Sequence, residues 1–176
     1  MVQIALAMGC AGLCILLADG MADGIMKPLV ARPRPSMDPY LKYVVSVVDN
    51  YRGSGFSFFS AHAANTMSLA VFFSLLVRNK LFGTVMIIWS LLNCWTRLYL
   101  GLHYPIDIFC GMVWGVIAGV ISYLVFYKLY FKFSPKFNYI SSQYTATGYS
   151  RVDIDVVMMV IVLILAVVML LSLSVF

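Results

Sequence analysis

The sequence predicts an all-α fold, a polytopic transmembrane helical bundle of about five spans. Hydrophobic residues make up 62% of the 176 residues and charged residues only 11%, whereas soluble domains average about half and about a quarter. A soluble domain of this length could not bury so much apolar surface. The composition therefore indicates an integral membrane protein and argues against a disordered chain, a disulfide scaffold or a nucleic-acid-binding domain.

Five apolar runs approach the length of roughly 20 residues that a helix needs to cross a bilayer. We predict spans at residues 4–26, 60–77, 81–100, 105–127 and 156–176. The first run has no basic residue before it and carries Asp19 and Asp23 near its far end. We therefore interpret it as a span and not as a signal peptide.

Two segments between the spans are long. After Lys27, the prolines Pro28, Pro33 and Pro35 are expected to prevent a continuing helix. An interfacial amphipathic helix is expected next, because four residues recur there at helical spacing: Tyr40, Val44, Val47 and Tyr51. The second long segment, 131–155, is rich in Tyr, Ser and Thr over residues 131–150 and is expected to be a cytoplasmic linker.

Basic residues outside the spans bear on orientation, since Lys and Arg concentrate on the cytoplasmic side of membrane proteins. One face carries Arg78, Lys80, Lys128, Lys132, Lys136 and Arg151, and we assign it to the cytoplasm. The opposite face carries as many: Lys27, Arg32, Arg34, Lys42, Arg52 and Arg97. The basic cluster on that outer face therefore needs a reason other than topology.

Polar residues near the membrane converge on the outer face, because the direction of the spans alternates. They are Lys27, Ser60, His62, Arg97, His103 and Asp107, and they include both histidines of the chain. His103 is expected in a tight link between Gly101, which suits the left-handed cap of a helix, and Pro105, which suits a first turn. Asp107 would then reach an imidazole N–H and fix its tautomer.

The same face offers groups that bind anions. Ser60 fits a helix N-cap, where the backbone N–H groups of Ser60, Ala61 and His62 would face an anion. Three cations add donors suited to phosphate oxygens: Lys27, Arg34 and Arg97. Two histidines, a carboxylate, three cations and a helix N-terminus together predict a phosphoryl-transfer site with no metal and no other cofactor.

Each of these residues also has a purely structural interpretation. Lys27 and Arg97 could be anchors that reach the membrane interface, and His103 with Asp107 could be a simple ion pair. Convergence on one face favours the site. The four cysteines lie in apolar runs without metal-ligand spacing, and we interpret them as small buried residues: Cys10, Cys14, Cys94 and Cys110.

The order and spacing of these residues resemble the three motifs of the type 2 phosphatidic acid phosphatase family, which is similar to vanadium haloperoxidases and bacterial acid phosphatases. The matching segments are Lys27-x6-Arg34-Pro35, Ser60-Ala61-His62 and Thr96-Arg97-x5-His103-x3-Asp107. The family patterns are K-x6-R-P, P-S-G-H and S-R-x5-H-x3-D. Phe59, Ala61 and Thr96 stand where the family usually has Pro, Gly and Ser, and none of these differences removes a reactive group.

The resemblance implies a metal-independent phosphatase that works through a phosphohistidine. His103 would be the nucleophile, Asp107 would orient it, and His62 would protonate the leaving oxygen and then activate water. The phosphate would be held by Lys27, Arg34, Ser60, Ala61 and Arg97. Ala61 would serve this role at a negative φ and would be strained at a positive φ.

The resemblance also divides the chain. Residues 1–130 would form the catalytic membrane domain, 131–155 the cytoplasmic linker and 156–176 an additional C-terminal transmembrane helix. Membrane enzymes of the family usually carry two spans before the one that leads into the first motif, and none precedes it here. We therefore consider a shortened protein or a truncated sequence; two added spans would leave the orientation unchanged.

Taken together, we expect an enzyme of the cell (inner) membrane with its active site outside the cytoplasm and an anionic membrane lipid phosphate as substrate. Candidates are phosphatidic acid, phosphatidylglycerol phosphate, undecaprenyl pyrophosphate and lipid A phosphate. Two alternatives use the same residues: a lipid phosphotransferase and a catalytically inactive lipid-phosphate-binding protein. Neither a nucleic-acid partner nor halide oxidation is expected, and the residues predict no oligomeric state.

Overall fold

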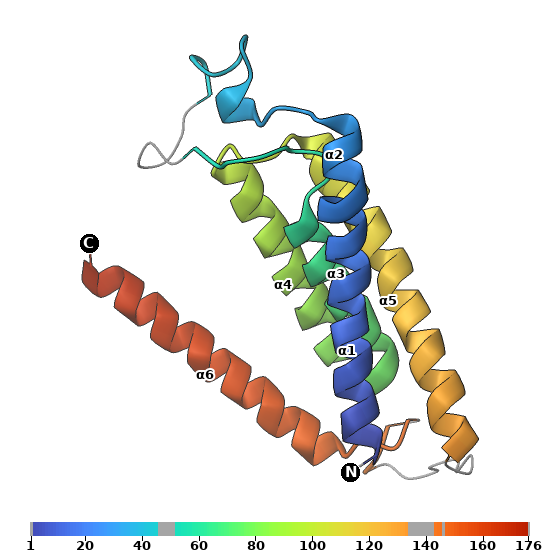
Figure 1. The fold of residues 1–176 in the computed structure, drawn as a ribbon. Coiled ribbons are helices and arrows are strands. Elements are labelled where there is room, and N and C mark those ends of the chain that lie inside the picture. The colour runs from blue at the N-terminus through green and yellow to red at the C-terminus, as the bar shows by residue number, and fades with distance from the viewer. Residues whose placement is uncertain (1, 46–51, 134–142, 146, 176) are drawn as a thin grey trace.

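The computed structural model describes residues 2–45, 52–133, 143–145 and 147–175. Within these ranges the chain is helical, apart from turns, irregular connections and one isolated β-bridge between Tyr144 and Ser150. The bundle consists of α1 (Val2–Met21), α3 (Ala61–Val77), α4 (Lys80–Tyr99) and α5 (Pro105–Phe133). The last helix, α6 (Arg151–Val175), diverges from this bundle towards the C-terminus (Figure 1).

The prediction of an all-α membrane bundle is confirmed. In the described part of the chain, three helical stretches are long and apolar enough to cross a membrane: Gln3–Met37, Lys80–Tyr99 and Pro105–Tyr130. The helix α3 is apolar but shorter. The helices α5 and α6 both extend into the segment predicted as a linker, of which residues 134–142 and 146 lie outside the description. Membrane crossing by α6 stays a prediction.

The first helix passes Pro28, so the prediction that this proline ends it is wrong. A π-helical turn, η1 (Ala22–Met26), follows α1 and leads into the short helix α2 (Lys27–Val30). The Lys27 N–H bonds to the Ala22 carbonyl, five residues back. Pro28 therefore enters at the start of a new helical segment, where its missing N–H removes little. The helix ends instead at Ala31, which is left-handed at φ 48°.

The interfacial helix predicted from Tyr40 onwards does not form in residues 39–45. A 3₁₀ turn, η2 (Pro35–Met37), is followed by turns in which the Asp38 carboxylate accepts the N–H groups of Tyr40 (2.9 Å) and Leu41 (3.3 Å). The side chains of Tyr40 and Val44 are 89% and 80% exposed, so no apolar face is buried here. Val47 and Tyr51 lie outside the described residues.

The central helix α3 packs against α1, α4 and α5. At three glycines of α5, an added Cβ would lie 2.6 Å from a carbonyl oxygen at the start of α3 or within it: Gly111 against Ser60, Gly115 against Ala64 and Gly119 against Ser68. Only glycine permits this approach of two backbones, as in other closely packed membrane helices. The glycines therefore hold the start of α5 against the start of α3.

Small residues also bring α1 close to the other helices. Every fourth residue on the inner face of α1 and its continuation into η1 is buried: Cys10, Cys14, Ala18 and Ala22. The Trp114 indole N–H donates to the Leu17 carbonyl (3.1 Å) and ties α5 to α1. Cys94 is buried on α4. These three cysteines therefore act as the small buried residues that the sequence predicts.

Candidate active site

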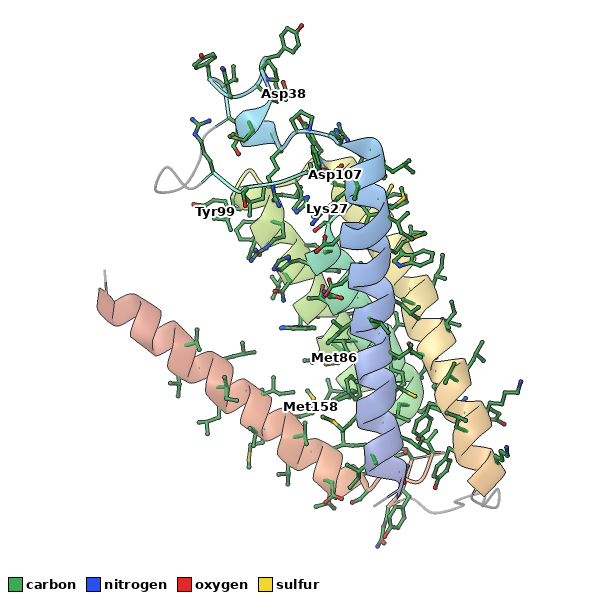
Figure 2. The ribbon with its side chains drawn as sticks, viewed as in Figure 1. Lys27, Asp38, Met86, Tyr99, Asp107 and Met158 are labelled. Atoms are coloured by element: carbon green, nitrogen blue, oxygen red, sulfur yellow. The ribbon has the colours of Figure 1, made fainter. Side chains whose placement is uncertain are left out.

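A pocket of about 380 Å³ lies at the α2 end of the bundle. Six of its lining residues are site residues predicted from sequence: Lys27, Arg34, Ala61, His62, Arg97 and His103. Figure 2 shows the labelled Lys27 and Asp107 at this end of the molecule. The other two predicted residues, Ser60 and Asp107, are fully buried and do not line the pocket. The structure thus brings six of the eight residues to one cavity.

Local sequence signals position these residues as predicted. The Ser60 hydroxyl accepts the Ala63 N–H (3.3 Å) and caps α3. Gly101, at φ 63°, follows the end of α4, and Pro105 begins α5. His103 therefore lies in the short link between two fixed helix ends, as the spacing predicts.

The start of α3 lies at the pocket, which Ala61 and His62 line. Ala61 and His62 are its first two residues, whose N–H groups have no acceptor within the helix. Ala61 is helical and so avoids the positive φ that would strain an alanine. The Ser60 N–H instead donates to the Asp107 carbonyl (3.1 Å), which ties this cap to α5.

His103 is oriented by a backbone carbonyl. Its side chain is almost fully buried, with Nδ1 2.9 Å from the Ser57 carbonyl oxygen and 3.8 Å from Asp107 Oδ2. A carbonyl can only accept a hydrogen bond, so this contact places the proton on Nδ1. The lone pair of Nε2 is then available for nucleophilic attack.

Asp107 is held more closely by other groups than by His103. Its carboxylate accepts hydrogen bonds from Arg32 Nη1 (3.1 Å), the Tyr104 N–H (3.0 Å) and the Ser57 hydroxyl. The Tyr104 contact caps α5: Asp107 lies in the first turn of this helix and accepts the N–H of the residue just before it. Asp107 therefore acts on His103 in two ways. Its charge lies near the imidazole ring, and Ser57 links the two residues, because its hydroxyl donates to Asp107 and its carbonyl contacts His103.

Three cationic side chains line the pocket. Arg34 is oriented by the carbonyl oxygens of Ser54 (2.9 Å from Nε) and Leu102 (3.3 Å from Nη1). The Lys27 ammonium forms an ion pair with Asp23, one turn earlier in the chain. Arg97 Nε lies 3.3 Å from the hydroxyl of Thr96. A phosphate entering here would meet three cations.

The acidic side chains of the pocket are partnered as well. Asp23 pairs with Lys27, and Asp19 of α1 accepts a hydrogen bond from the Asn65 amide of α3 (2.7 Å). Asn65 lies one turn after His62 on the same helix. This contact fixes α1 beside the pocket, and the Asn65 amide stabilises the carboxylate of Asp19 by donating a hydrogen bond to it.

A short polar chain connects the buried Asp107 carboxylate to the segment of residues 35–45. The Arg32 guanidinium lies 3.9 Å from the centre of the Tyr104 ring, and the Tyr104 hydroxyl donates to Asp38 Oδ2 (3.1 Å). Partial burial, then donation to Asp38, raises the pKa of the Tyr104 hydroxyl. Hydrogen bonds from the Tyr40 N–H foremost, and from Tyr104, lower the pKa of Asp38.

The sequence profile of the PAP2 superfamily, the type 2 phosphatidic acid phosphatases, matches residues 7–131 of this chain. That range includes every lining residue of the pocket. The chain belongs to the PAP2 superfamily.

Two curated PAP2 relatives carry the name lipid A 4′-phosphatase. The protein of Bacteroides thetaiotaomicron is 42% identical over 104 residues, which are 58% of this chain and 46% of the relative. The protein of Porphyromonas gingivalis is 38% identical over 105 residues, 58% of this chain and 44% of the relative. The aligned part of the chain thus spans less than half of each relative's length. No solved structure matches the chain.

The departures from the PAP2 pattern leave the polar contacts in place. Ala61 keeps a helical backbone and lines the pocket, and the Thr96 hydroxyl contacts Arg97 as a serine hydroxyl could. Phe59, where the family has proline, is buried against Ala18 and Ala22 of the first helical stretch and Ala61 and Ala64 of α3.

Several residues that line or support the pocket were not predicted, among them Arg32, Ser57, Asp19 and Asn65. Arg32 had a usable signal, since it is a cation two residues before Arg34 in a proline-rich segment. Asp19 also had one, because an acidic residue inside a span is expensive unless it is partnered. Ser57 and Asn65 had none, because their roles depend on which distant residue they meet.

Proposed function

We propose that this PAP2 chain carries the catalytic core of a membrane lipid phosphatase that hydrolyses a phosphate monoester on an anionic lipid head group. The observation that carries the proposal is the pocket in which both histidines and three cations meet. We further propose the 4′-phosphate of lipid A as substrate, since both relatives are named for that reaction.

The proposed reaction has two steps. His103 Nε2 attacks phosphorus, the bond from phosphorus to the lipid oxygen breaks, and protonated His62 gives its proton to that oxygen. A water, deprotonated by His62, then attacks the phosphohistidine, the phosphorus–nitrogen bond breaks and inorganic phosphate leaves. The Ser57 carbonyl keeps the proton on Nδ1 throughout, and Asp107 stabilises the positive charge that the ring gains.

The cations serve the transition state in this proposal. Lys27, Arg34 and Arg97 face the phosphate oxygens, together with the N–H groups of Ala61 and His62 at the positive end of the α3 dipole. Charge stabilisation then comes from the protein's own groups, which supports a metal-independent reaction. We also propose that this end of the bundle faces outside the cytoplasm.

The test is phosphate release by the purified chain in detergent with EDTA present. Lipid A, phosphatidic acid, phosphatidylglycerol phosphate and undecaprenyl pyrophosphate would be compared. His103→Asn retains a side-chain N–H for the Ser57 carbonyl but has no nucleophilic nitrogen, so release should fall by about a thousandfold or more. Tyr99→Phe, at the same end but outside the pocket lining, is the control and should keep wild-type activity.

Each other outcome has a meaning. Activity retained in folded His103→Asn would overturn the nucleophile assignment, and activity abolished by EDTA would overturn metal independence. Release that needs an added alcohol acceptor would identify a phosphotransferase. Lipid A binding without release from any lipid would identify the inactive binding protein instead.

A further inference from the structure

We call the candidate active site, at the α2 end of the bundle, the α2 pocket. A second basic pocket lies at the opposite end of the bundle. It measures about 330 Å³ and is lined by Arg78, Asn79, Lys80, Leu81, Thr145 and Arg151. Three of these six side chains are cationic, and no acidic side chain of the described residues lines it. Asp153, in the first turn of α6, is the acidic residue nearest in sequence and is exposed.

The backbone brings these cations together from separate elements. Arg78 ends α3 in a left-handed conformation, with its N–H on the Ser74 carbonyl (3.1 Å), and Asn79 caps α4. Arg151 begins α6, and its N–H bonds to the Gln143 carbonyl (2.9 Å). The Thr147 hydroxyl donates to the Val77 carbonyl (3.2 Å) and holds this turn against the end of α3.

Three cations in one pocket repel one another unless an anion sits between them. The starts of α4 and α6 add the positive ends of two helix dipoles, since Lys80 and Arg151 are their first residues. Arg78 has one neutral partner, the Tyr123 hydroxyl (3.3 Å). The electrostatics of the pocket therefore favour an anionic ligand.

An apolar groove adjoins the basic pocket and shares Arg78, Asn79 and Lys80 with it. The groove has a volume of about 760 Å³ and runs between α3 and α4. Gly83 lines it together with four aliphatic side chains: Val71, Leu75, Ile87 and Ile88. A ligand that fills both the basic pocket and the apolar groove must carry an anionic group at one end and a hydrocarbon chain at the other.

We propose that this pair of cavities binds an anionic phospholipid of the surrounding membrane. The phosphate lies among Arg78, Lys80 and Arg151, and one acyl chain lies along α3 and α4. Basic pockets between membrane helices are suited to such head groups. This site shares no lining residue with the α2 pocket, so its lipid is not the substrate. The bound lipid would connect the α3–α4 turn to the start of α6.

The test is retention of phospholipid by the purified chain, counted by native mass spectrometry. Phosphatidylglycerol would be compared with phosphatidylcholine of the same acyl chains. The wild-type chain should prefer phosphatidylglycerol by at least about tenfold, and Lys80→Gln/Arg151→Gln should lose that preference. The matched control is Lys128→Gln/Lys132→Gln, which removes the same charge from exposed positions near the end of α5.

Two further arms separate the head group from the tail. Ile87→Phe narrows the groove and keeps every charge, so it should weaken retention of phosphatidylglycerol. Glycerol 3-phosphate, which lacks acyl chains, should not compete with the bound lipid. The proposal is overturned if the control pair loses the preference equally, if the wild-type chain shows none, or if glycerol 3-phosphate competes. None of these readouts depends on phosphate release, so the proposed function can fail independently.

Discussion

Arg32 and Arg34 lie two residues apart, yet they serve different groups. Arg34 lines the pocket, whereas Arg32 contacts the Asp107 carboxylate (3.1 Å) and the Tyr104 ring (3.9 Å). Asp107 is fully buried, and a buried charge that loses its partner destabilises a protein strongly. We therefore propose that Arg32 is a positioning residue, which acts on the proposed nucleophile His103 through Asp107 and Ser57.

Replacing Arg32 should lower kcat and leave KM nearly unchanged. In Arg32→Gln we expect kcat to fall by about a hundredfold, because the Asp107–Ser57–His103 arrangement shifts while the phosphate-binding cations remain. Arg32→Lys should recover part of the loss, since it keeps the charge but not the planar fork. The control is Arg52→Gln, whose guanidinium contacts the Ser36 carbonyl. A raised KM with kcat unchanged would mean that Arg32 binds substrate directly.

The sequence predicted the site residues that depend on local structure or on counting spans. Ser60 as a cap and Gly101 before the His103 link follow from chemistry within a few residues. The contact of Ser57 with His103, 46 residues away, could not be predicted, because it depends on how the Ser57 segment packs against the start of α5. The sequence predicted a direct contact between Asp107 and His103 because it could not show the intervening Ser57. In the structure, Asp107 Oδ2 lies 3.8 Å from His103 Nδ1.

At the scale of helices, apolar runs predicted that the four bundle helices exist, and local signals predicted three of their ends: Ser60 before α3, Gly101 after α4 and Pro105 at the start of α5. Two predictions at this scale are wrong: a π-helical turn lets the first helix pass Pro28, and turns replace the predicted helix after Asp38. In both, hydrogen bonds decide the outcome: the Lys27 N–H moves to a carbonyl five residues back, and the Asp38 carboxylate takes two N–H groups. Hydrophobic periodicity carries no information on either.

The contact between α3 and α5 can be tested with a pair of glycines. In Gly115→Ala the new Cβ would lie 2.6 Å from the Ala64 carbonyl oxygen and 2.8 Å from Met67 Cβ, whereas in Gly12→Ala no atom lies within 4 Å. Both substitutions raise helix propensity by the same amount. Gly115→Ala should lower stability by about 1–3 kcal/mol, and Gly12→Ala should not. Thermal inactivation midpoints in detergent would compare the two; equal midpoints would contradict close backbone packing.

The segment of residues 38–45 should loosen at acidic pH. Because the pKa of Asp38 is lower in the folded chain than its ordinary value of 3.8, ionised Asp38 favours the folded segment. That contribution is full above the ordinary pKa and is lost as pH falls through the lowered value. Proteolysis at residues 38–45 should therefore accelerate below about pH 4. The variant Asp38→Asn should be cut faster at neutral pH and lose this dependence; an unchanged pH profile would contradict the anchoring role.

At the scale of the whole molecule, the two ends of the bundle are both basic but differ in how the charge is arranged. At the α2 end, Lys27 and Arg34 have protein partners and line a polar pocket that also holds two acidic residues. At the other end, Arg78, Lys80 and Arg151 line a pocket with no acidic residue among those described. If the cations at the α2 end bind substrate, as we propose, this difference explains why a count of Lys and Arg could not orient the chain.

The orientation itself predicts which end is reached from outside the cell. Ser54 is exposed at the α2 pocket, and Lys132 is exposed at the end of α5 near the opposite face. Cysteine introduced as Ser54→Cys should react with a membrane-impermeant maleimide in intact cells, and Lys132→Cys only after permeabilisation. The buried native cysteines Cys10, Cys14 and Cys94 should give little background, and the wild-type chain measures it. The reverse pattern would place the active site in the cytoplasm, and the basic residues at the α2 end would then follow the positive-inside rule without any substrate.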